Sequence, residues 1–138
     1  MGAYRAGFRP SRWLEKPYAM VALGACAAAT DEEAERLRSS QVMAFARLRT
    51  GMPGKLPRPV RDVDAEIGAP MRQAVDRALR ISAVGDEAQV REQLGRLVET
   101  YQPDELILTG QIHDHAARLR RFEIAAKAAG ALKVSQAA

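Results

Sequence analysis

The sequence has one cysteine, two histidines and few aromatic residues, and each shortage excludes a class of structure or site. Cys26 has no partner for a disulfide within its own chain of 138 residues, which excludes a disulfide framework. Phe, Tyr and Trp make up only 5% of the residues, which disfavours a nucleic-acid surface of stacked aromatic rings. Because Cys26 lies in an apolar run, we expect a buried, reduced thiol, as is typical of a cytoplasmic protein.

The sequence also lacks a long apolar run. The longest, residues 18–29, has 12 residues, whereas a membrane-spanning helix needs about 20. The first 16 residues are rich in Arg and contain no apolar core of the kind that a secretory signal has. Ala6 stands where a myristoylation signal needs Ser or Thr. We therefore expect a soluble, cytoplasmic protein without a membrane partner.

The charge is moderately positive, with a net charge of +4 and a pI of about 9.6. Lys and Arg are interspersed with Asp and Glu, and the one dense basic cluster, residues 118–121, has no aromatic residues interleaved with it. This pattern indicates a solvated, mixed-charge helix face rather than a nucleic-acid interface. The length, with 47% hydrophobic and 28% charged residues, predicts a single domain over residues 1–138.

A buried strand followed by a helix is the clearest local pattern. Residues 18–28 are apolar without alternation, as in a parallel strand that is covered on both faces. Thr30 and Glu33 form a capping-box pattern, which predicts a helix that runs to near Thr50. The helical spacing predicts that one stripe of this helix is buried, made of Ala34, Leu37, Gln41, Phe45 and Leu48.

Prolines and glycines then interrupt the chain. Three prolines and two glycines lie within residues 51–61, and we expect an irregular excursion over about residues 51–69. A second helix is predicted over residues 70–80, because Pro70 suits a first turn and apolar residues follow it at a spacing of four.

The last third is typical of strand, helix, strand and helix in succession. Residues 81–84 and 106–108 form short apolar runs, and Asp86 between them predicts the cap of a helix of about 15 residues. We expect these two strands to be parallel neighbours joined by a right-handed crossover. The final helix is expected over residues 114–129, and its inward-facing residues are predicted to be Ala116, Leu119, Phe122 and Ala126.

The sequence thus predicts about three parallel strands with four to five helices. Such a sheet leaves two edges unpaired and is too small to cover the apolar helix stripes. Residues 4–9 are typical of the tail of a helix that follows an earlier strand. We therefore expect a portion of a larger β/α fold, or a subunit that completes itself on a partner.

Four stretches of the sequence occur in a specific order, namely YRAGFRPS, PYAMVALGACAAATDEEAERL, SAVGDEAQVREQL and DELILTGQIHDHAARLRRFEIAA. Together they cover about residues 4–130 and resemble the C-terminal part of the bacterial luciferase-like, flavin-dependent monooxygenases. The resemblance implies an α/β fold that is a partial (β/α)₈ TIM-type barrel, with the last three strands and an inserted helical segment in this chain. A whole barrel needs about 250 residues, so the chain corresponds to a truncated one.

The resemblance also implies an activity. Members of this family bind reduced FMN at the C-terminal mouth of the barrel and oxidise a small organic substrate with O₂, and a flavin reductase is a further partner. Most of the family's flavin-binding residues come from earlier strands, so we expect no tight cofactor binding and no activity from this chain alone. We expect a homo-oligomer, or completion by an N-terminal barrel half. The alternative is a non-catalytic α/β interaction module that self-associates or complements such a half.

The loop after the last predicted strand holds the candidate site residues. In a barrel, residues 109–115 would lie at the face where barrel enzymes carry their chemistry. The candidates for lining a flavin or substrate pocket are Gln111, His113, His115 and Arg118. A structural interpretation competes with this one: Asp114 caps the final helix, His115 covers its first turn, and Arg118 anchors the helix through a carboxylate. The catalytic residues cannot be assigned from the sequence.

Metal and phosphate sites are the less favoured interpretations. His113 and His115 are the two histidines of the chain, no cysteine lies near them, and Asp114 would point away from them in an extended segment. We therefore predict no metal site, and a metal-dependent hydrolase is a third, weaker hypothesis. Asp86 after Gly85 predicts a helix cap rather than a phosphate site, because the carboxylate would repel an anion.

Overall fold

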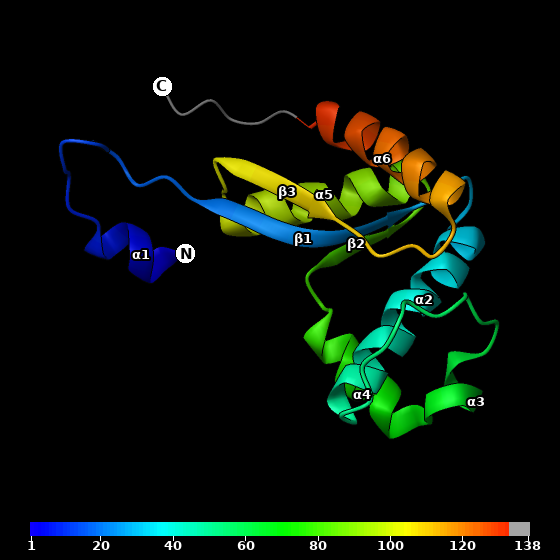
Figure 1. Cartoon of the computed structure of the whole chain (residues 1–138). Coiled ribbons are helices and arrows are strands. Elements are labelled where there is room, and N and C mark those ends of the chain that lie inside the picture. Colours follow the sequence, from blue (N-terminus) through cyan, green and yellow to red (C-terminus); the bar gives the residue numbers. More distant parts are fainter. Residues whose placement is uncertain (133–138) are drawn as a thin grey trace.

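The structure is a computed structural model that describes residues 1–132, in which six helices accompany a three-stranded parallel sheet (Figure 1). The strands are β1 (Met20–Ala27), β2 (Ser82–Gly85) and β3 (Glu105–Thr109). The helices are α1 (Gly2–Gly7), α2 (Asp31–Arg49), α3 (Val63–Ile67), α4 (Ala69–Ala78), α5 (Glu87–Tyr101) and α6 (His115–Gly130). The prediction of an α/β fold with three parallel strands is confirmed, and there are six helices where four or five were predicted.

The order of the strands differs from the expected one. The prediction that β2 and β3 are neighbours is wrong, because each of them pairs with β1 and the order is β2-β1-β3. β2 pairs with residues 24–27 of β1, and β3 pairs with residues 20–24. A barrel winds its strands in chain order, so the partial barrel is not confirmed. The order is that of an open sheet wound in both directions from its central strand.

The two faces of the sheet are covered unequally. α5 and α6 pack on one face, where the buried cluster comprises Leu23, Ala25, Ala27, Ala83, Val90, Leu94, Ala125 and Ala128. On the other face α2 packs near the C-terminal end of β1, around Cys26. Met20 and Ile107 on this second face are 52% and 44% exposed. The prediction that β1 is covered on both faces therefore holds only for its C-terminal half.

The starts of three helices follow the predicted caps. Thr30, Asp86 and Asp114 each accept a hydrogen bond from the backbone N–H three residues later, at 3.2, 2.8 and 2.8 Å. Each cap satisfies an N–H that has no partner within the first turn of its helix. The side chain of Glu33 accepts from the N–H of Ala29 at 3.3 Å rather than from that of Thr30, so the capping box forms only in part.

Two helices bury faces other than the predicted ones. Leu119 and Phe122 of α6 are 51% and 48% exposed, although they were predicted to face inward. The buried residues of α6 are instead Arg121, Ala125 and Ala128. Leu48 ends the predicted stripe of α2 but is 60% exposed. The second half of α2 packs toward α3 and α4 instead, through Val42, Met43 and Ala46.

The segment after α2 is less irregular than predicted. Residues 51–62 form neither helix nor strand, but α3 lies within the expected excursion of residues 51–69 and is capped by Asp62. A helix of five residues has too few turns to give a periodic signal in the sequence. The helix predicted over residues 70–80 corresponds to α4. No helix within residues 1–132 combines the length and apolar character that crossing a membrane requires.

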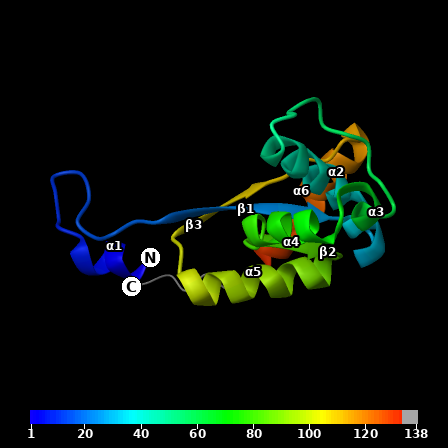
Figure 2. The ribbon, with the colours of Figure 1, turned by 90° about the horizontal axis from the view of Figure 1, so that it is seen from below.

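The N-terminal segment with α1 extends beyond the sheet, while α5 runs along it (Figure 2). Arg5 links this segment to the end of α5, because its guanidinium donates to the backbone oxygens of Tyr101, at 3.1 Å, and Gln102. α1 overlaps the helix tail that was predicted over residues 4–9, but it ends at Gly7.

A buried arginine lies where β1 and β3 separate. Arg121 of α6 is 0% exposed, and its Nη1 donates to the backbone oxygen of Ala25 at 3.0 Å, one residue beyond the last residue of β1 that pairs with β3. Gly110 follows β3 and packs against this guanidinium. A Cβ at residue 110 would lie 2.3 Å from Arg121 Nη1 and 2.7 Å from the Ala25 oxygen. Residue 110 must therefore be a glycine while Arg121 occupies this position.

The substitution Gly110→Ala is expected to lower the free energy of unfolding by about 1–3 kcal/mol, the usual cost of overpacking. Its Cβ would meet the backbone oxygen of Ala25, which cannot move independently of β1. Urea denaturation followed by circular dichroism measures the change. Gly130→Ala is the matched control, because nothing lies within 4 Å of its Cβ position and alanine is favoured in a helix. Wild-type stability for Gly110→Ala would contradict the packing described.

Candidate functional site

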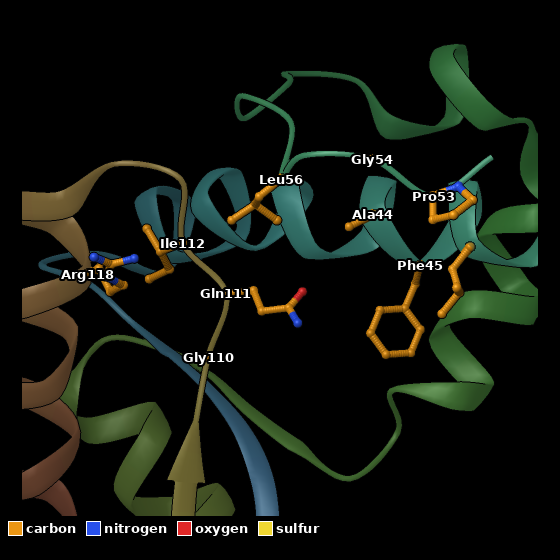
Figure 3. Close-up of a pocket in the computed structure, with 10 residues that line it drawn as sticks. Ala44, Phe45, Pro53, Gly54, Leu56, Gly110, Gln111, Ile112 and Arg118 are labelled. Carbon is orange, nitrogen blue, oxygen red and sulfur yellow. The ribbon is translucent and has the colours of Figure 1, made fainter.

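An open cavity of about 410 Å³ lies beside the C-terminal end of β3. Its walls are α2, the segment of residues 53–56, the loop that joins β3 to α6 and the first turn of α6 (Figure 3). Ligand pockets have volumes of about 300–1,000 Å³. In an open parallel sheet, ligands bind outside the carboxyl ends of the strands, where successive connections run in opposite directions. For the order β2-β1-β3 this place lies between β1 and β3, and the cavity adjoins it.

The lining of the cavity is mainly apolar and includes two longer polar side chains. Phe45, Leu48 and Leu56 supply hydrocarbon surface, while Gln111 and Arg118 supply an amide and a guanidinium. Figure 3 shows Gln111 pointing from its loop toward the side of the cavity that carries Phe45, whereas Arg118 lies at the end beside α6. This arrangement can hold a small organic molecule that has a flat or aliphatic part and a hydrogen-bonding edge.

Two of the four predicted pocket residues line the cavity. All four side chains are exposed; Gln111 and Arg118 contribute to the wall of the cavity, whereas His113 and His115 lie outside the lining. Arg118 Nη2 lies 2.7 Å from His115 Nδ1. Within residues 1–132 no carboxylate forms an ion pair with Arg118, so the expected anchor is not found there. Asp114 caps α6, as predicted.

In the described part of the chain, no third metal ligand lies beside the two histidines. Residues 1–132 contain no group of three or more His, Cys, Asp and Glu side chains that could hold a metal ion. Asp114, which lies between the histidines in sequence, uses Oδ1 to accept from the N–H of Ala117. The geometry of these residues therefore gives no support to the hypothesis of a metal-dependent hydrolase.

Cys26 is buried at the contact between β1 and α2, as predicted. Its Sγ donates to the backbone oxygen of Ala34 at 3.3 Å. Burial raises the pKa of the thiol to about 12, although the positive charge of Arg121 acts in the opposite direction. The thiol therefore stays protonated at neutral pH and packs as a small apolar group rather than reacting as a nucleophile.

Several residues of this region were not identified from the sequence. Gly110 carried a usable signal, because a glycine that directly follows a strand often marks a close approach by another group. Leu56 carried none, since it lies in the segment that was expected to be irregular. The inward direction of Arg121 also had no signal, because this residue belongs to the basic cluster that was interpreted as a solvated face.

Comparisons with known proteins give relatives for this chain. No family model matches it. It is 43% identical over 122 residues to a luciferase-like monooxygenase of Escherichia coli (strain K12), and the match covers 88% of this chain and 36% of that protein. It is 40% identical over 124 residues to the uncharacterized protein YvbT of Bacillus subtilis (strain 168), covering 89% of this chain and 37% of that protein.

A solved structure is also similar. The match to the crystal structure of apo-MsnO8 covers 94% of this chain and 40% of that chain, with a TM-score of 0.74 and 27% sequence identity. The chain spans a little over one third of the length of the curated relatives it matches. The resemblance seen in the sequence is therefore confirmed, and the chain is a homologue of luciferase-like monooxygenases over a segment that makes up about a third of such a protein.

Proposed function

We propose that the chain is the C-terminal portion of a luciferase-like, FMN-dependent monooxygenase that oxidises a small organic substrate in the cytoplasm. The observation that carries the proposal is the 43% identity to the luciferase-like monooxygenase of Escherichia coli. In this reaction one atom of O₂ enters the substrate and the other leaves as water, and reduced flavin supplies the two electrons. A flavin reductase is the partner that provides the reduced flavin.

The lining of the cavity suits one side of a flavin. Phe45, Leu48 and Leu56 offer apolar surface for a flat ring, and the amide of Gln111 can hydrogen-bond to a polar ring edge. The guanidinium of Arg118 can pair with an anionic group of the same ligand. The role of these residues is to bind and orient the ligand, and α2 excludes water from the side that it covers.

The open half of the sheet supports completion by further chain. Met20 and Ile107 expose apolar surface on one face. Within the described residues, β2 and β3 each pair on one side only, and residues 20–23 of β1 have no neighbour on the side of β2. Stable proteins cover such edges and patches. We propose an N-terminal half of the same protein as the cover, in line with the greater length of the relatives, and a homo-oligomer as the second candidate.

The non-catalytic interaction module is the less favoured function. The comparisons do not support it, because the relatives that carry a functional name are called monooxygenases.

A chimera tests the flavin-binding part of the proposal. Residues 1–138 replace the matching segment of the Escherichia coli relative, and the product is expected to bind FMN. The 138-residue chain alone is expected to show no tight binding, because its open cavity covers only one side of a ligand. Titration followed by flavin fluorescence quenching measures both, with the unaltered relative as control. The proposal fails if the relative binds FMN and a folded chimera does not. Tight stoichiometric FMN binding by the chain alone would contradict the proposal that further chain completes the flavin site.

In the same chimera, Gln111→Ala is expected to raise the Kd for FMN about tenfold, which corresponds to about 1.4 kcal/mol for one lost hydrogen bond. The same fluorescence titration gives the Kd. His113→Ala is the matched control, because His113 is exposed on the same loop outside the cavity, and its Kd should stay within about twofold of the parent value. Equal effects of the two substitutions would show that Gln111 does not contact the flavin.

A further inference from the structure

Arg121 is a buried cation with an unpaired edge. Its side chain is 0% exposed and its Nη1 donates to the Ala25 oxygen at 3.0 Å, but Nε and Nη2 have no hydrogen-bond partner in the part of the chain that the structure describes. Among residues 1–132, no Asp or Glu forms an ion pair with it. Because removing a charge from water is unfavourable, buried charges in proteins are paired with an opposite charge or fully hydrogen-bonded. Arg121 therefore lacks a partner that its position requires.

The two unpaired nitrogens lie on the same edge of the guanidinium. The N–H of Nε and one N–H of Nη2 point in nearly the same direction within the plane of the group. Their spacing matches the two oxygens of one carboxylate, which is the reason for bidentate Arg–carboxylate pairs. Nη1 is already bonded to β1. The open edge of Arg121 is thus the one that binds a carboxylate through two parallel hydrogen bonds.

The surroundings of Arg121 make room for the guanidinium without neutralising it. Gly110 leaves space for Nη1, which a Cβ would approach to 2.3 Å. Burial lowers the pKa of Arg121 and the charge of Arg118 acts in the same direction, whereas Cys26 acts in the opposite one. The ring of Phe122 stacks on the guanidinium, with its centroid 3.7 Å from Cζ, and is itself 48% exposed. An exposed side chain therefore covers one face of the group.

We propose that the Nε–Nη2 edge of Arg121 is a carboxylate-binding site. The inference goes beyond the monooxygenase function and does not depend on it, because it follows from the unpaired guanidinium alone. The carboxylate belongs either to a small organic acid or to an acidic side chain of a second copy of this chain. The chemistry of recognition is the same for both sources.

Formate, the smallest carboxylate, is the probe for this site. It is titrated into the 138-residue chain at constant ionic strength, with chloride as the balancing anion. The readouts are the NMR resonance of the Arg121 Nε–H and the thermal unfolding midpoint. We expect a saturable shift of the resonance and a rise in Tm, neither of which chloride produces. Formate binds N–H donors of the folded state, so it stabilises that state by mass action.

Substitutions at and beside the site separate a specific effect from a general one. Arg121→Met is expected to abolish the effect of formate on Tm, and Arg121→Lys to weaken formate binding at least tenfold, because lysine lacks the planar fork. Arg120→Met is the matched control, since Arg120 is exposed on the same helix and should leave the response unchanged. Arg121→Lys keeps the test decisive if Arg121→Met does not fold, because it retains the charge and the long side chain; an unchanged formate affinity in Arg121→Lys would contradict the proposal.

Light scattering after size-exclusion chromatography distinguishes the two sources of the carboxylate. If the carboxylate comes from a second copy of the chain, the chain is a dimer, and formate and Arg121→Met each dissociate it. If the carboxylate comes from a free acid, the molar mass is the same with and without formate, and formate binding is saturable. The proposal is overturned if the mass, the Tm and the Nε–H resonance of the folded chain are all insensitive to formate.

Discussion

β1 pairs with two strands along different parts of its length, and the rest of the structure depends on this constraint. β2 pairs along residues 24–27 of β1 and β3 along residues 20–24, on opposite sides. Helices α2 and α5 consequently pack on opposite faces of the sheet. The carboxyl end of β3 then lies beside α2, and the cavity forms between them. The position of the candidate site is thus a consequence of the strand order.

The contact between Gly110 and Arg121 links the stability of the sheet to the shape of the cavity. Arg121 bonds to β1 at the point where β3 leaves it, and Gly110 provides the space for this guanidinium. Gly110 also lines the cavity, directly before Gln111. A change that displaces the guanidinium therefore displaces the loop that carries the polar wall of the site. Fold and site are coupled here through one side chain.

Features set by neighbouring residues could be predicted from the sequence, whereas features set by distant contacts could not. The caps at Thr30, Asp86 and Asp114 depend on residues within one turn, and all three form. The strand order could not be predicted, because the same apolar run fits either side of β1. The inward face of α6 was mispredicted because its alanines suit either face, and because burial of Arg121 opposes the usual preference of arginine for solvent.

The place of the candidate site was predictable in part. Gln111 and His113 were both proposed from their loop after a strand, where parallel sheets carry ligands. The structure places Gln111 in the lining of the cavity and both histidines outside it, a difference that depends on the direction of each side chain. The apolar wall of Phe45 and Leu56 depends on how α2 and residues 53–56 fold over the loop. No local pattern in the sequence contains that information.

The inward position of Arg121 also fixes its distance along the chain from the start of α6. The cap at Asp114 sets where the helix begins. An α-helix turns by about 100° per residue, so inserting one residue between Asp114 and Arg121 would swing the guanidinium away from Ala25 and turn its neighbour toward the sheet. Among homologous chains, insertions or deletions between these two positions should therefore occur only together with replacement of the arginine.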